Sequence, residues 1–162
     1  MDLVDNLVVL SSRVVPTKVA AEIGPSPWRG LLEHHIEVAR LELARFGGKE
    51  VDATAYGFLA SFEDPAAAIS CADAIRRDVR GLGIEVGAGI HIGECNVRGD
   101  DVEGIAVDVA AQLDKVARPG EIVVSQAVRD SAADSRISFE ERGTLQLGRD
   151  PHEWSVFTAA MD

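Results

Sequence analysis

The sequence predicts an α+β fold in which a mixed, mostly antiparallel sheet carries packed helices, and we expect those helices on one face. β-Branched runs alternate along the chain with segments of helical spacing, and some neighbouring runs are close enough to form hairpins. The chain has 162 residues, of which 46% are hydrophobic, enough to bury a core. No repeat or low-complexity linker divides it, so we expect one domain over residues 1–162.

The first half of the chain contains five expected elements. The β-branched run NLVVLS (residues 6–11) predicts a buried strand. A short helix is expected over residues 17–23. Ser26 followed by Pro27 is typical of a helix start, and apolar residues then recur at helical spacing until Gly47-Gly48 ends the helix. Two strands, 50–54 and 57–62, are expected to flank a turn at Ala55-Tyr56.

The second half begins with Asp64-Pro65, which is expected to cap a helix ending at Gly81 to Gly83. Alternating residues 84–92 predict a strand, with a hairpin turn at residues 98–101. A helix over 104–117 should end before Pro119-Gly120. Shorter runs predict a strand at 122–124, a helix at 126–132, and strands near 137–140 and 154–157.

Charge and composition exclude several functions. The formal net charge is −11, which repels nucleic acid and anionic membrane surfaces in the absence of a basic cluster. No apolar run reaches the roughly 20 residues that span a bilayer, and the beginning MDLVDNLVVL lacks a basic segment typical of a secretory signal. Two cysteines form no disulfide framework. We therefore expect a cytoplasmic protein of bacterial type, with no nucleic-acid or membrane partner.

Four segments together resemble the catalytic domains of class III nucleotide cyclases, the adenylate and guanylate cyclases. They are LARFGGKEVDATAYGFLASFEDPAAAISCADAIR (43–76), GIEVGAGIHIGE (83–94), RGDDVEGIAVDVAAQL (98–113), and the ending PGEIVVS with RGTLQLGRDPHEWSVF. The resemblance implies a ferredoxin-like βαββαβ core and a head-to-tail dimer with its sites in the seam. Active members use two Mg²⁺ or Mn²⁺ ions, held by two aspartates, to drive attack of the ribose 3′-hydroxyl on the α-phosphate.

The resemblance places three site positions in the first half of the chain. Counting back from the family-like Trp28, the first metal aspartate falls on Ser12. An alternative alignment makes Asp5 that ligand, but it leaves too few residues for the strand. The second metal aspartate is replaced by Tyr56, which we interpret as a turn residue packing its ring on the sheet. Asp52 stands where active members have a purine-reading lysine.

The remaining three positions lie in the segment expected to form the helix over 104–117. The resemblance places Ile105 at the purine-reading aspartate, Asp108 at the transition-state asparagine and Gln112 at the transition-state arginine. Spacings of three and four put them on one helical face, expected to look into the dimer seam. All six positions are therefore changed, and the chain is similar to the family as a degenerate member.

We therefore expect a non-catalytic interaction or regulatory module with no catalytic residue, metal ligand or cofactor, paired with itself or with a catalytic cyclase protomer. Two alternatives stay open. The former nucleotide cleft could bind another small molecule, neutral or cationic, or the chain could be a cyclase with weak or unconventional activity.

Other chemistry-bearing residues receive structural interpretations. Gly87 and Gly89 indicate close backbone packing, and His91 a hydrogen-bonded core histidine. His34 and His35 are expected at the surface. Cys71 is expected in the core, whereas Cys95 could be reactive.

Overall fold

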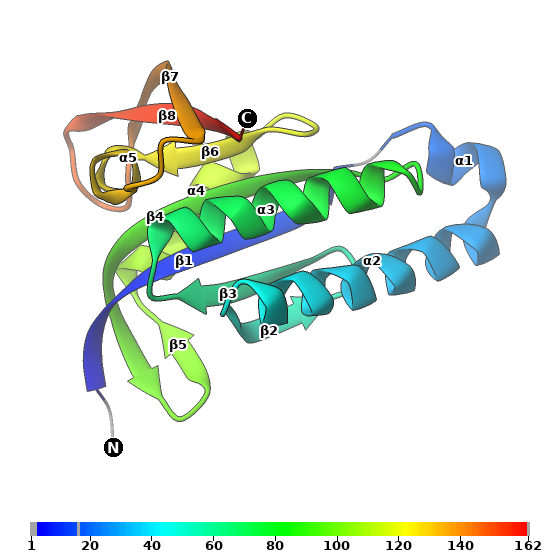
Figure 1. The fold of residues 1–162 in the computed structure, drawn as a ribbon, viewed down its shortest axis with the longest axis horizontal. Helices are drawn as coiled ribbons and strands as arrows, with labels where there is room; N and C mark the ends of the chain where they lie inside the picture. Colours follow the sequence, from blue (N-terminus) through cyan, green and yellow to red (C-terminus); the bar gives the residue numbers. More distant parts are fainter. Residues whose placement is uncertain (1–2, 16, 162) are drawn as a thin grey trace.

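The computed structural model describes residues 3–15 and 17–161 as thirteen elements (Figure 1). The strands are β1 (Leu3–Val15), β2 (Lys49–Thr54), β3 (Gly57–Phe62), β4 (Glu85–Arg98), β5 (Asp101–Glu103), β6 (Ile122–Ser125), β7 (Ile137–Gln146) and β8 (Glu153–Met161). The helices are α1 (Val19–Ile23), α2 (Pro25–Arg45), α3 (Pro65–Arg80), α4 (Ile105–Val116) and α5 (Gln126–Ser131). Both the order and the type of the predicted elements are confirmed.

All the strands join one sheet in the order β2-β3-β1-β4-β6-β8-β7, and β5 pairs with β4 outside this path. The first four strands have the order of a ferredoxin-like split βαβ motif, with β1 antiparallel to both β3 and β4. The pair β4–β6 is parallel. The predicted α+β class with a mostly antiparallel sheet is therefore confirmed.

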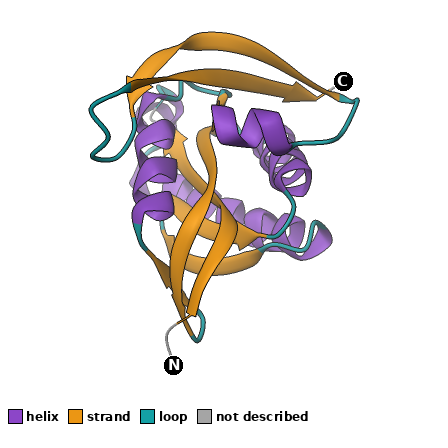
Figure 2. Cartoon of the chain, turned by 90° about the vertical axis from the view of Figure 1, so that its left-hand side faces the viewer, coloured by secondary structure: helices purple, strands orange, loops and turns teal. Residues whose placement is uncertain are grey.

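Helices cover both faces of the sheet, so the expectation of helices on one face is wrong. Val8, Leu10 and Val14 of β1 share a core with α2 and α3, whereas Val9 packs with Ala106 and its neighbours from α4. Side chains alternate between the faces of a strand, so one strand serves both layers. Figure 2 shows helices on both sides of the central strands.

Several strands are longer than the sequence-based expectation: β4 ends at Arg98 and not at residue 92, and β7 and β8 extend to Gln146 and Met161. Two other boundaries also differ. β1 continues to Val15, because β4 pairs with it as far as Val15↔Glu85. Helix α2 begins at Pro25 with Gly24 as its N-cap, so Ser26 is not the cap. Proline lacks an N–H and has a fixed φ, which suits the first turn of a helix.

Helix α4 lies unusually close to β4 at Gly89. A Cβ atom there would stand 2.3 Å from the Asp114 nitrogen and 2.4 Å from the Ala110 oxygen. The prediction that this glycine permits close backbone packing is confirmed. Among the described residues, no helix is long and apolar enough to cross a membrane.

Candidate functional site

A shallow hollow of about 260 Å³ lies where β1 runs beside the β2–β3 hairpin, and it is bordered by Ser12, Asp52 and Tyr56. The strands meet closely here: the Val14 N–H donates to the Tyr56 carbonyl at 2.6 Å. A Cβ at Gly57 would lie only 2.2 Å from the Ser12 carbonyl oxygen. The structure thus brings together the three predicted positions from the first half of the chain.

Ser12 belongs to a buried stretch of β1. The residue is 5% exposed, and it alternates in phase with Leu10 and Val14, which pack on the α2 and α3 side. Asp5, the alternative metal ligand, is seven residues earlier, about 23 Å away along an extended strand. Asp5 borders a different hollow, so it does not join this one.

The two hairpin residues offer weak metal ligands. Tyr56 is 58% exposed, so its ring projects from the turn and is not packed on the sheet as expected. Asp52 is also exposed, and its Oδ1 already accepts a hydrogen bond from the Ala53 N–H at 2.9 Å. The polar side chains that border the hollow are one carboxylate, one guanidinium and four hydroxyls, from Asp52, Arg13, Ser11, Ser12, Thr54 and Tyr56.

This donor set does not fit the two divalent ions that the fold family implies. Mg²⁺ and Mn²⁺ prefer several charged oxygen ligands, whereas serine, threonine and tyrosine side chains offer hydroxyl oxygens. Within residues 3–15 and 17–161, no group of three or more His, Cys, Asp or Glu side chains is placed to hold a metal ion.

The α4 positions lie on one helix as predicted but have three different environments. Ile105 begins the helix and is 73% exposed, and Asp108 is exposed one turn later. Gln112 is occupied: its Nε2 donates to the Gln146 carbonyl and its Oε1 accepts from the Gly148 N–H at 3.0 Å. Gln112 therefore holds the β7–β8 loop against α4, which is a structural role.

Ile105 also borders a larger cavity of about 550 Å³ between α4, α5, β4 and the β7–β8 loop. Ser12, Asp52 and Tyr56 do not border this cavity, and neither do Asp108 and Gln112. Within one chain, the six predicted positions thus fall into at least two separate places. The cavity was not predictable from the sequence, because its lining comes from segments distant in the chain.

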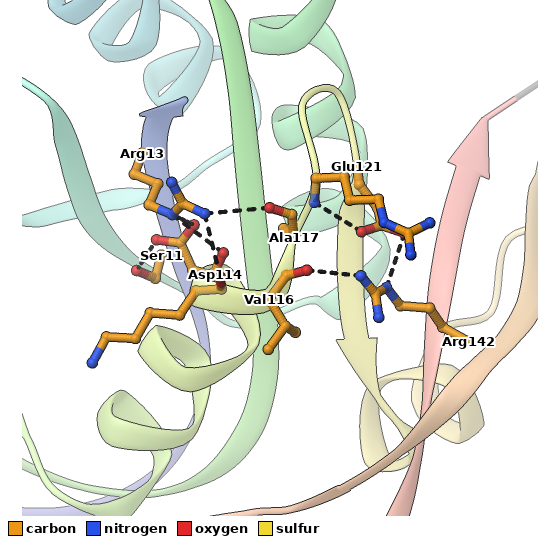
Figure 3. Close-up of polar contacts among 9 residues, drawn as sticks. Ser11, Arg13, Asp114, Val116, Ala117, Glu121 and Arg142 are labelled. Carbon is orange, nitrogen blue, oxygen red and sulfur yellow. Dashed lines mark hydrogen bonds and ion pairs between the residues drawn. The ribbon is translucent and has the colours of Figure 1, made fainter. Parts of the chain in front are cut away.

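A buried polar cluster between β1 and α4 was also missed (Figure 3). The Ser11 hydroxyl donates to Asp114 Oδ2 at 3.0 Å. Arg13 Nε lies 3.3 Å from Asp114 Oδ1 as an ion pair, while the Arg13 guanidinium donates to the carbonyls of Asp114 and Ala117 at 3.3 Å each. These contacts tie the C-terminal end of α4 to β1.

Burial raises the pKa of the Asp114 carboxyl to about 7, although Ser11 and Arg13 act to lower it. Asp114 is therefore a weaker acid than an ordinary aspartate. Beyond the end of α4, Arg142 donates to the Val116 carbonyl at 2.7 Å and to Glu121 at 3.0 Å. The sequence contained one indication of the cluster between β1 and α4: Asp114 directly follows Leu113 on the apolar face of α4.

Burial decides the expectations for four further residues. His34 is exposed as expected, but His35 is fully buried, so that expectation is wrong. Cys71 lies in the core as expected. Cys95 is buried within β4 and burial raises its thiol pKa, which disfavours the reactive thiolate.

Comparison with solved structures identifies the fold. The adenylyl cyclase CyaB from P. aeruginosa superimposes with a TM-score of 0.88 at 18% identity, over 100% of this chain and 97% of that one. The adenylate/guanylate cyclase/hydrolase from Silicibacter pomeroyi gives 0.81 at 24% identity, over the full length of both chains. The chain has the fold of a class III nucleotide cyclase domain.

This cyclase fold extends to relatives described in different assembly states. A guanylyl cyclase domain of the RhoGC fusion protein from Blastocladiella emersonii, described as dimeric, has a TM-score of 0.81 at 12% identity, over 99% of this chain and 98% of that one. Adenylate cyclases from Trypanosoma brucei, described in their monomeric state, reach 0.83 at 16%, over 96% and 88%. No protein-family profile and no curated protein sequence matches the chain.

Proposed function

We propose that this chain is a catalytically inactive cyclase-fold domain that acts as a dimerising regulatory or interaction module. One observation carries this most directly. At the two positions where the resemblance expects metal-binding aspartates, the chain has a buried serine, Ser12, and an exposed tyrosine, Tyr56. Among the described residues that border the hollow, Asp52 is the one carboxylate, which is fewer charged oxygens than two divalent ions need.

Replacing these charged residues should remove much of the electrostatic stabilisation of a cyclase transition state. A preorganised charge or donor at a reacting phosphate or oxyanion contributes about 3–4 kcal/mol of transition-state stabilisation, and here several are replaced together. Gln112, at the expected arginine, is already bonded to the β7–β8 loop. Asp52 and Asp108 add negative charge beside the expected nucleotide, in a chain whose net charge is already −11, so a triphosphate is repelled.

Enzymatic assay tests the loss of chemistry. The purified chain is incubated with ATP or GTP and with Mn²⁺ or Mg²⁺, and cyclic nucleotide is quantified by mass spectrometry beside an active cyclase domain. We expect no cyclic AMP or cyclic GMP above the protein-free blank. Product formation that scales with protein concentration would contradict the proposal.

Exposed apolar side chains support a role in association. Ile105 of α4 and Tyr56 of the hairpin turn are large hydrophobic residues exposed to water, and the resemblance to the cyclases places both positions in the dimer seam. Light scattering coupled to size exclusion at tens of micromolar tests self-pairing, and a uniformly monomeric protein would count against the homodimer. Ile105→Glu should dissociate the pair, whereas Leu41→Glu, at a site of matching exposure (71% against 73%), should not.

A catalytic cyclase protomer is the other proposed partner. Mixing this chain with a separately purified active cyclase domain should change the rate of cyclic-nucleotide formation if the two pair. Addition of the Ile105→Glu variant should leave that rate unchanged. If both the homodimer and this effect are absent, the association role is refuted.

We also propose a single domain over residues 1–162 and a cytoplasmic location. Both cysteines, Cys71 and Cys95, are free thiols, which suits a reducing compartment. Fractionation of the native host would test the location directly.

A further inference from the structure

We infer that the cavity between α4, α5 and the β7–β8 loop is a binding site for a small amphipathic monocarboxylate, a molecule with a flat apolar body and one anionic end. The cavity volume of about 550 Å³ lies within the range of small-molecule sites, about 300–1,000 Å³. The inference does not rest on the lost cyclase chemistry, because all the residues that border the cavity belong to one chain, and Ile105 is the lining residue shared with the proposed pairing surface.

The walls of the cavity are apolar and partly open to water. Ile105 and Trp154 are large hydrophobic residues with exposed fractions of 73% and 44%, and both border the cavity together with Val109 and Leu147. The Trp154 ring is held in place, since its indole N–H donates to Asp150 Oδ2 at 2.9 Å. A fixed aromatic wall favours a flat, apolar body that stacks on it.

A neutral polar pair lies deeper in the cavity. His91 Nδ1 and Ser125 Oγ are 2.7 Å apart, and Ser125 is 99% buried, with its Oγ also accepting from the Val128 N–H. Burial lowers the pKa of His91 to about 4, so the pair carries no charge at neutral pH. The other ring nitrogen of His91, Nε2, lies close to Gly93: a Cβ atom added to Gly93 would be 3.2 Å from it. Among the described residues, Nε2 has no hydrogen-bond partner. The pair can therefore make one neutral hydrogen bond to a ligand.

The charged residues around the cavity leave one cation without a partner. Asp150 accepts from His152 and Trp154, and Asp130 pairs with Arg129 at 3.3 Å. Arg149 borders the cavity, and no hydrogen bond or ion pair joins it to any other residue of the described chain. An unpaired guanidinium matches a carboxylate, which it can bind through two parallel hydrogen bonds. The ligand end at this rim is therefore anionic.

Polyanions fit this cavity poorly. The two aspartates at the rim and the net charge of −11 disfavour a triphosphate, which one arginine cannot neutralise. A single carboxylate needs only one cation. We therefore expect monocarboxylates to bind and nucleoside triphosphates not to compete.

Isothermal titration calorimetry of the full chain tests the site with 1-naphthoate and its neutral isostere 1-naphthamide. We expect saturable binding of 1-naphthoate, at least tenfold tighter than that of the amide. Arg149→Gln should weaken naphthoate binding at least tenfold and leave the amide within twofold, whereas Arg118→Gln, which does not border the cavity, should change neither. Ala127→Phe should fill the mouth and abolish binding, whereas Ala133→Phe should not.

Several outcomes would overturn the assignment. They are no saturable binding at millimolar naphthoate, equal affinity for acid and amide, or binding insensitive to both Arg149→Gln and Ala127→Phe. Affinity that weakens as the protein concentration rises would show that a second copy occupies the cavity, and this also overturns the small-molecule assignment. Circular dichroism of each variant verifies its fold. Cyclase assays and light scattering report on the proposed function separately, so either can fail without the other.

Discussion

Replacing His35 with leucine should stabilise the protein. His35 lies on α2 with 0% exposure, and among the described residues neither ring nitrogen has a hydrogen-bond partner. A buried polar group without a partner costs about 1–3 kcal/mol, and an apolar side chain of similar size removes that cost, with repacking costing under about 1.5 kcal/mol. We expect a net gain of about 1–2 kcal/mol, or roughly 2–8 °C in Tm for a domain of this length.

The gain should depend on pH. Burial lowers the pKa of His35 below its ordinary value of 6.5, so the unfolded chain takes up a proton that the folded chain refuses. The titration of His35 therefore leaves stability unchanged above pH 6.5 and lowers it as the pH falls from 6.5 toward the folded pKa. The stability difference between His35→Leu and the unchanged protein should therefore widen from pH 7.5 to pH 5.

Urea unfolding followed by circular dichroism measures both effects. His34→Leu is the matched control, because His34 is the exposed neighbour on the same helix, and it should stay within about 0.5 kcal/mol of the unchanged protein. Destabilisation of His35→Leu by 1 kcal/mol or more, on the order of a lost buried hydrogen bond, would refute the reasoning. It would show that water or a neighbouring group satisfies the ring nitrogens.

Two further predictions concern the contact between α4 and the sheet. Asp114→Asn should flatten the pH dependence of stability: the raised pKa of Asp114 makes its contribution fully present below about pH 4 and lost as the pH rises through about 7. Parallel urea midpoints from pH 4 to 8 would contradict this. Gly89→Ala should destabilise by about 3 kcal/mol, because its Cβ meets backbone atoms of α4. Gly30→Ala is the control: a Cβ at Gly30 on α2 meets no other atom, so this variant should be more stable by up to about 1 kcal/mol. Equal unfolding midpoints for Gly89→Ala and Gly30→Ala would contradict the close packing of α4 on β4.

The sequence predicted local elements well because their signals are local. Asp64 accepts the Ala66 N–H at 3.1 Å as the cap of α3, as Asp64-Pro65 indicated. The length of β1 was not predictable, because its last residues pair with β3 and β4, which lie more than 40 residues later in the chain. The two helix layers were missed for a related reason: Val8 and Val9 are both apolar, so the pattern does not say which face each covers.

The candidate site was predicted by position but not by environment. The resemblance to the cyclase family located Ser12 and Tyr56, and the structure does bring them to one hollow. Spacing did not indicate that Gln112 is bonded to the β7–β8 loop, or that Asp114 is buried beside Ser11. His35 is the opposite case, because the sequence did contain the signal for its burial. Its spacing of three and four from Leu32 and Ala39 placed it on the buried face of α2, and this signal was available in the sequence.

Metal binding by the hollow beside β1 tests the central claim most directly. Amide NMR spectra of the isotopically labelled chain are recorded during titration with Mn²⁺ in the presence of a non-hydrolysable nucleotide. A paramagnetic ion held there would selectively broaden the amides of Ser12, Asp52 and Tyr56. We predict no selective broadening at these residues. Saturable broadening centred on them, at micromolar Mn²⁺, would contradict the account.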